Sequence, residues 1–210
     1  MSDSISLAAL QKYFGDSFEK VQQFTDMLQD EGETRGLIGP REIDRLWERH
    51  ILNSAALVQY LPKTGTLADI GSGAGLPGIV VACMLPEVTC YLIEPMERRC
   101  NWLNEVKDTL ALHNVVVERG RAEQYHGKLS VDIVTARAVA NLAKLSKWIL
   151  PLLKSGGSMM ILKGTNVSQE IEPALPILKK FNMSPPEIIT ANTIDGAEST
   201  TVLRSLRVKK

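Results

Sequence analysis

The chain has 210 residues and no net formal charge, with 44% hydrophobic and 23% charged residues. This composition supports a folded core and excludes a disordered chain. No apolar run reaches the roughly 18 residues that a membrane helix needs. The N-terminus also lacks the basic and apolar regions of a signal peptide. We therefore expect a single globular unit that resides in the cytoplasm.

The three cysteines and three histidines show no spacing typical of a metal site. No CxxC, HxxxH or HExxH pattern occurs in the sequence. We therefore expect neither a metal site nor a disulfide framework. Cys83 falls inside an apolar predicted helix, Cys90 in a predicted strand and Cys100 in a predicted helix, which favours core packing over a role as nucleophile.

The first 65 residues are predicted to be helical, because apolar residues recur there at three- and four-residue spacing. The expected helices cover residues 4–14, 18–28, a segment that begins at Pro40 and includes Trp47, and 54–60. We expect residues 1–65 to form a helical extension that packs on a domain formed by residues 66–210.

From residue 66 onward, predicted strands alternate with predicted helices. The strands cover residues 66–70, 89–93, 115–117, 131–135, 157–162, 187–191 and 200–208. The helices cover residues 76–85, 96–112, 142–153 and 167–181. Such alternation predicts a Rossmann-like α/β fold with a mostly parallel seven-stranded sheet covered on both faces. No helix separates the last two strands, so the C-terminal strand should be antiparallel.

A glycine-rich segment, Asp69-Ile-Gly-Ser-Gly-Ala-Gly-Leu-Pro-Gly78, joins the first strand to the next helix. This turn binds nucleotide-like ligands in doubly wound sheets. The dinucleotide fingerprint GxGxxG would need glycine at position 76, where this chain has Leu76. The pattern DxGxGxG instead resembles motif I of class I S-adenosylmethionine-dependent methyltransferases. Its candidate cofactor-binding residues are Asp69, Gly71, Gly73 and Gly75.

Glu94 ends the second predicted strand, about 20 residues beyond the glycine loop. An acid at this place can accept hydrogen bonds from both ribose hydroxyls of an adenosine. Capping of the following helix is the alternative role.

Several further motifs occur in a fixed order along the chain. They are Trp47-Glu-Arg-His-Ile-Leu-Asn-Ser54, the glycine loop, Gly120-Arg-Ala-Glu123, Ala136-Arg-Ala-Val-Ala140, Gly156-Gly157 and Lys163-Gly164. Over residues 15–208 this set resembles the RsmG (GidB) family of small-subunit ribosomal RNA guanine-N7 methyltransferases. The resemblance implies the class I S-adenosylmethionine-dependent methyltransferase fold. It also implies methyl transfer from S-adenosylmethionine to N7 of one guanosine in 16S rRNA, near the decoding centre.

The same resemblance assigns roles to individual positions. Its cofactor-binding positions are matched by Gly71, Leu76, Ala122, Glu123 and Arg137, and Glu94 stands at the place of the acidic ribose ligand. Asn53 departs from the family pattern, where we expect aspartate, so an ionic role at this position is in doubt.

Methylation of guanine N7 needs no general base, because the attacking lone pair carries no proton. We therefore assign no catalytic residue, and alignment with exclusion of water can supply most of the catalysis. His50 is expected to tie the N-terminal segment to the core.

RNA should be held mainly through its phosphates. Residues 133–169 contain basic residues and no acid, which suits a polyanion, although a solvated helix face has the same composition. The candidate RNA contacts are Arg98, Arg99, Arg121, Lys144, Lys147, Lys163, Arg204 and Arg207. The expected partner is 16S rRNA in the small ribosomal subunit or in an assembly intermediate.

Three alternative functions stay open. The first is an S-adenosylmethionine-dependent methyltransferase that acts on a small molecule or a protein. The second is a nucleotide-dependent oxidoreductase, which Leu76 opposes. The third is a non-enzymatic RNA-binding protein of ribosome assembly, which the intact glycine motif opposes.

Overall fold

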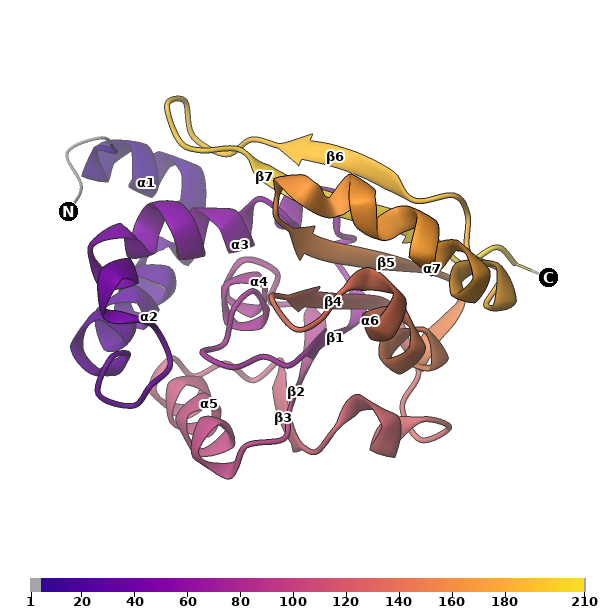
Figure 1. Ribbon diagram of the computed structural model, residues 1–210. Helices are drawn as coiled ribbons and strands as arrows, with labels where there is room; N and C mark the ends of the chain where they lie inside the picture. The colour runs from indigo at the N-terminus through magenta and orange to yellow at the C-terminus, as the bar shows by residue number, and fades with distance from the viewer. Residues whose placement is uncertain (1–4, 210) are drawn as a thin grey trace.

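In the computed structural model, the described residues 5–209 contain one seven-stranded sheet (Figure 1). Its strand order is β3-β2-β1-β4-β5-β7-β6. The strands are β1 Gly65–Ile70, β2 Val88–Glu94, β3 Val115–Arg119, β4 Val131–Arg137, β5 Leu153–Lys163, β6 Glu187–Ala191 and β7 Thr200–Leu206. The order reverses between β1 and β4, and in open α/β sheets ligands bind outside the strand ends at this switch point.

The direction of the strands agrees with the sequence-based prediction. The five strands from β3 to β5 are parallel, whereas β7 pairs antiparallel with both β5 and β6. In Figure 1 the arrowheads of β4, β5 and β6 point to the side where the N-terminal helices lie. The carboxyl ends of the parallel strands therefore meet at one edge, next to the N-terminal segment.

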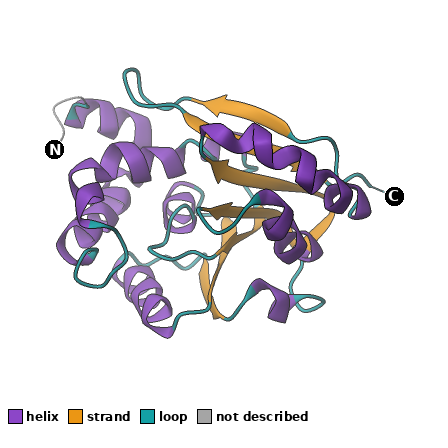
Figure 2. Cartoon of the chain, in the orientation of Figure 1, coloured by secondary structure: helices purple, strands orange, loops and turns teal. Residues whose placement is uncertain are grey.

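The helices cover both faces of the sheet (Figure 2). They are α1 Leu7–Phe14, α2 Phe18–Glu31, α3 Asn53–Ala55, α4 Gly78–Met84, α5 Glu97–Thr109, α6 Leu142–Ile149 and α7 Ser168–Lys180. The first helix begins after Ser6, whose hydroxyl accepts a hydrogen bond from the backbone N–H of Ala9 at 3.2 Å. Ser4, where we expected this helix to begin, lies outside the described residues.

The segment between α2 and the sheet differs from the expected α-helices. Pro40–Arg45 and Val58–Tyr60 are 3₁₀ turns, and Leu46–Leu52 is a π-helix. Leu46 and Ile51 are both buried and lie five residues apart, which is the spacing of the π-helical hydrogen bond. Apolar residues at short intervals predicted a helix here, but they did not distinguish its pitch.

Two hydrophobic clusters lie on opposite faces of the sheet. One contains Phe24 of α2, Ile79 of α4 and Trp102 of α5, all fully buried, together with other residues of the N-terminal helices. The other contains Leu145 of α6 and Leu178 of α7. Each such buried side chain contributes roughly 1.5–3 kcal/mol, so the N-terminal segment is held by the same core as the sheet. No helix in residues 5–209 is long and apolar enough to cross a bilayer.

Candidate functional site

A cavity of about 470 Å³ opens at the carboxyl ends of β1, β2 and β4, where the strand order reverses. The glycine loop, Glu94 and Arg137 contribute to its lining. Because the glycine loop that lines it is the predicted cofactor-binding segment, we refer to it as the cofactor cavity. Its position is the one that the strand order predicts for a ligand.

The glycine loop presents backbone to this cavity. Gly71 has φ +71° and Gly75 has φ +100°, which L side chains rarely adopt. A Cβ atom on Gly71 would lie 2.8 Å from Cγ2 of Val139, and one on Gly75 would lie 2.7 Å from Cγ1 of Ile79. Only glycine therefore fits at these two positions. Helix α4 begins at Gly78, two residues later than expected, after a cis peptide bond between Leu76 and Pro77.

Asp69 is a fully buried residue of β1 that supports the glycine loop and does not line the cavity. Its Oδ2 accepts a hydrogen bond from the backbone N–H of Gly78 at 3.0 Å. Burial raises the pKa of Asp69 to about 7, while hydrogen bonds from Gly78 and Ser72 and the charge of Arg137 act in the opposite direction. Gly75 is likewise absent from the cavity wall. In this structure these two residues, which we predicted as cofactor contacts, shape the loop.

Glu94 lies at the end of β2 with only 2% of its surface exposed. Its Oε2 accepts a hydrogen bond from the N–H of Gly73 and its Oε1 one from the N–H of Met96, both at 2.9 Å. Each carboxylate oxygen keeps a second acceptor position. Glu94 therefore fixes the entry to α5, the alternative role above, and still offers acceptor capacity to the cavity that it lines.

Arg99 and Arg121, which we predicted as RNA contacts, line the cofactor cavity. The Nη1 atom of Arg99 lies 4.0 Å from Oε2 of Glu94, and its buried Nε has no hydrogen-bond partner among the described residues. An unsatisfied buried donor beside a cavity suits a polar ligand. Nothing in the sequence indicated that Leu37 and Trp148 would join the lining. For Arg99, the place in the first turn of α5 was the only signal.

The other predicted cofactor residues reach the same cavity. Gly73 and Leu76 line it from the glycine loop, and Ala122 and Glu123 line it from the 3₁₀ turn after β3. Arg137 is the last residue of β4, whereas we expected it just after the strand.

Arg137 links this edge of the sheet to the N-terminal segment. Its Nη1 donates to the carbonyl oxygen of Arg49 at 3.4 Å, and burial lowers the pKa of its guanidinium. His50, which we expected to tie this segment to the core, has its Nε2 hydrogen bonded to Glu42 within the same segment at 3.1 Å. Burial, followed by the charge of Arg137, lowers the pKa of His50 to about 4. The imidazole is therefore neutral at physiological pH.

A second cavity of about 460 Å³ adjoins the first, and we call it the neighbouring pocket. The two share Arg137, the last residue of β4, and Ala138 and Val139 in the loop that follows it. Ala138 has φ +55°, a strained conformation for a residue with a Cβ atom. Residues of this kind cluster at functional sites.

Charged and polar side chains from distant parts of the chain line the neighbouring pocket. Lys163, at the end of β5, donates from Nζ to the carbonyl of Ala140 at 2.8 Å and pairs with Oε2 of Glu170 at 2.7 Å. Asn53 donates from Nδ2 to the hydroxyl of Thr200 at 3.1 Å. The carboxamide thus has a neutral partner at the position where we expected aspartate.

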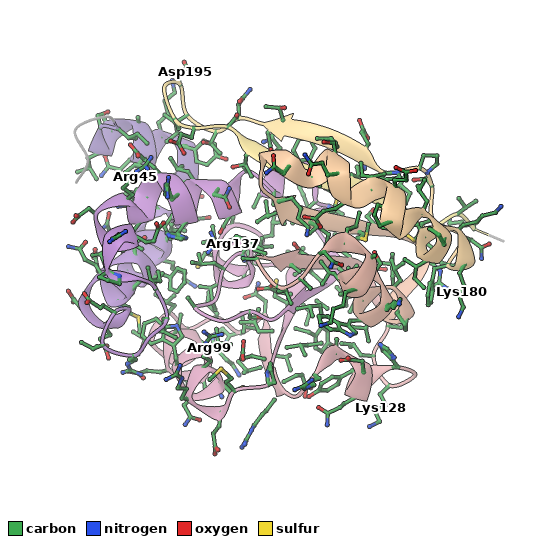
Figure 3. The ribbon with its side chains drawn as sticks, viewed as in Figure 1. Arg45, Arg99, Lys128, Arg137, Lys180 and Asp195 are labelled. Carbon is green, nitrogen blue, oxygen red and sulfur yellow. The ribbon has the colours of Figure 1, made fainter. Side chains whose placement is uncertain are left out.

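The remaining RNA candidates lie in different places. Arg98, Lys144 and Lys147 are exposed on α5 and α6. Arg204 lies within β7. Arg207 lies at the edge of the sheet opposite the two cavities, where its guanidinium donates to the carbonyls of Leu150 and Leu153. In Figure 3, Arg137 lies near the middle of the molecule and Arg99 below it, whereas Lys180 lies at the far end. The structure thus brings only part of the predicted basic set near the two cavities.

Within residues 5–209, the cysteines and the acidic side chains form neither a metal-binding cluster nor a reactive thiol site. No three of the described His, Cys, Asp and Glu side chains converge as metal ligands would. Cys83, Cys90 and Cys100 are buried as predicted, and burial raises the pKa of Cys83 to about 12. A thiol in this state is a poor nucleophile.

Comparisons of the sequence with known proteins agree on one family. The family model described as rRNA small subunit methyltransferase G matches residues 17–184. A ribosomal RNA small subunit methyltransferase G from Beutenbergia cavernae is 44% identical over 199 residues, covering 95% of this chain and 94% of the relative. Another, from Thermobifida fusca, is 46% identical over 196 residues, covering 93% and 83%.

Among solved structures, a SAM-dependent O-methyltransferase from Thermotoga maritima matches with a TM-score of 0.61. It is 14% identical and the match covers 89% of this chain and 72% of that one. At this identity the likeness concerns the fold, which is that of the class I S-adenosylmethionine-dependent methyltransferases. The glycine backbone, the acceptor capacity of Glu94 and the free donor of Arg99 fit the polar groups of that cofactor.

Proposed function

The chain belongs to the rRNA small subunit methyltransferase G family, and on this premise we propose that it methylates N7 of one guanosine in 16S rRNA with S-adenosylmethionine as the methyl donor. The observation that carries the proposal is the pair of adjoining cavities. One is lined by the glycine loop and Glu94, and the other by Lys163 and Glu170.

The cofactor cavity supplies the groups that would hold the donor. Glu94 would accept hydrogen bonds from ribose hydroxyls, and the turn at Ala122 and Glu123 would border the adenine. Arg99 would donate to the carboxylate of the methionyl part, because its Nε is buried without a partner among the described residues. Bound here, S-adenosylmethionine supplies an electrophilic methyl group on a sulfonium sulfur.

The protein itself has little proton chemistry to perform. Guanine N7 attacks with a lone pair, so no proton must be removed and no side chain need act as a base. The neutral His50 and the buried Asp69 therefore need no catalytic role. Holding the base against the cofactor cavity and excluding water from both is the contribution expected of this chain.

Exposed basic residues on α5 and α6, the helices that contribute Arg99 and Trp148 to the cavity wall, would hold the RNA backbone. Arg98 lies on α5, and Lys144 and Lys147 lie on α6. Contacts of this kind release counterions and make binding depend on salt. The substrate would be the small ribosomal subunit or an assembly intermediate, in the cytoplasm.

Methyl transfer to ribosomal subunits tests the proposal. We would incubate the protein with radiolabelled S-adenosylmethionine and 30S subunits from cells that lack this activity, then locate the product by RNA digestion and mass spectrometry. Label in 7-methylguanosine at one position is the expected result. Cofactor binding without label in RNA would instead support a small-molecule or protein methyltransferase. RNA binding without cofactor binding would support an assembly protein.

A further inference from the structure

The neighbouring pocket contains an ion pair that is largely withdrawn from water. The side chain of Lys163 is 10% exposed and that of Glu170 is 31% exposed, and their charged atoms lie 2.7 Å apart. Removing two charges from water is costly, and well-packed apolar residues at such places are often equally stabilising or more so. The ion pair is therefore weak evidence for a purely structural role, although Glu170 and Lys163 also hold backbone groups of Leu142 and Ala140.

The hydrogen bonds of the pair leave one donor and one acceptor unused. Of the three N–H donors of Lys163, one is directed to Ala140 and one to Glu170. Oε2 of Glu170 accepts from Lys163 and from the backbone N–H of Leu142 at 2.6 Å. No described residue donates to Oε1 of Glu170. The pair thus holds a cationic donor and an anionic acceptor side by side at the wall of the pocket.

We propose that these two groups recognise the target base as guanine: Lys163 donates to O6, and Oε1 of Glu170 accepts from N1–H and the 2-amino group. This inference rests on the proposed function. Adenine would turn an amino group toward the lysine and an unprotonated N1 toward the carboxylate, so both contacts would fail. Sites whose buried polar groups are left unpaired by the wrong substrate discriminate strongly against it.

This mode of binding leaves N7 unobstructed. N1–H and the 2-amino group lie across the purine from N7, so a base held by them can turn N7 toward the shared wall of Arg137, Ala138 and Val139. The ion pair also suits the product. Methylation at N7 makes the base cationic, and a lysine without Glu170 would repel it, whereas the pair carries no net charge.

Replacing the target guanosine by inosine tests the contact to Glu170, because inosine lacks only the 2-amino group. We would reconstitute 30S subunits with 16S rRNA that carries guanosine or inosine at the position found by mass spectrometry. We would then compare initial rates of N7 methylation. The wild type should prefer guanosine by about tenfold or more, and Glu170→Ala should reduce this preference to about twofold.

Two further variants keep the test decisive. Glu170 also holds the backbone N–H of Leu142 at the start of α6, so Glu170→Ala loses stability. The guanosine-to-inosine ratio does not depend on the fraction of folded enzyme, and Glu170→Gln should lower it too, since its amide replaces the free acceptor oxygen by a donor. Glu172→Ala, an exposed change on the same helix, should keep the wild-type ratio.

The outcomes separate this inference from the proposed function. A wild type that forms 7-methylguanosine but methylates inosine equally well would overturn the recognition by Glu170 alone. The same conclusion follows if Glu170→Ala and Glu170→Gln both keep the wild-type ratio. A wild type that binds S-adenosylmethionine but forms no 7-methylguanosine would overturn the proposed function and this inference with it.

Discussion

The cofactor cavity and the neighbouring pocket share a wall but are built from different groups. In the cofactor cavity, backbone at the glycine loop and at Met96 surrounds the carboxylate of Glu94. In the neighbouring pocket, the charges of Lys163 and Glu170 lie at the ends of separate elements. A loop of backbone groups presents a fixed shape, whereas paired side chains present a pattern of donors and acceptors.

The difference suits the two kinds of ligand that we propose for these cavities. A cofactor that is the same in every turnover can be held by backbone whose conformation glycine alone permits. A base must be distinguished from three others, which requires hydrogen-bonding groups of defined polarity. Changes in the first region should therefore alter cofactor affinity, and changes in the second should alter the choice or affinity of RNA.

The largest effect is expected from Gly78→Ala, which should distort the glycine loop and with it the cofactor cavity. The new Cβ would lie 2.7 Å from Oδ2 of Asp69 and would also clash with Leu92. We expect a loss of about 1–3 kcal/mol in the free energy of unfolding and very weak cofactor binding. Chemical denaturation and calorimetry measure these effects. Gly39→Ala, with nothing within 4 Å of its Cβ, is the matched control.

Glu94→Gln should have a smaller effect, confined to the cofactor. The amide group would turn a donor toward the N–H of Gly73 or Met96 and would remove an acceptor for ribose. We expect the Kd for S-adenosylmethionine to rise about 10- to 100-fold, with unchanged affinity for RNA. Glu97→Gln, on an exposed side chain that pairs with Arg119, should leave the Kd unaltered. An equal loss in both variants would contradict the role of Glu94.

Lys147→Gln should give the smallest effect, confined to RNA. One phosphate contact on α6 would be lost, so affinity for the small subunit should fall about two- to fivefold and the salt dependence by about one unit of slope. Cofactor binding should stay the same. Filter binding at several salt concentrations measures the slope. Lys180→Gln, at the far end of α7 (Figure 3), should match the wild type, and an equal loss there would indicate nonspecific attraction.

The sequence was informative where structure is local. The period of apolar residues located all seven strands, and the glycine spacing located the cofactor cavity, because both depend on neighbouring residues. The pitch of Leu46–Leu52 was not predictable, since short apolar intervals suit several helical forms. The supporting role of Asp69 was also missed, because its partner Gly78 is reached only after the loop has folded back.

The neighbouring pocket was the least predictable part of the site. Lys163 was placed at the correct edge by topology, but its pairing with Glu170 requires α7 to fold back against β5. Asn53 reaches the same pocket from the N-terminal segment and contacts Thr200, 147 residues away in the chain. Residue spacing carries no information about such contacts.

The loop that separates the two cavities gives a ligand in one of them a route by which to affect the other. Val139 covers Gly71 closely enough to exclude a Cβ atom there, and it lines both cavities. A ligand that displaces Val139 from one side changes the space available on the other. Thermodynamic linkage then requires reciprocity. By whatever factor the cofactor changes the affinity for RNA, RNA changes the affinity for the cofactor, so the order in which the two arrive does not affect the stability of the ternary complex.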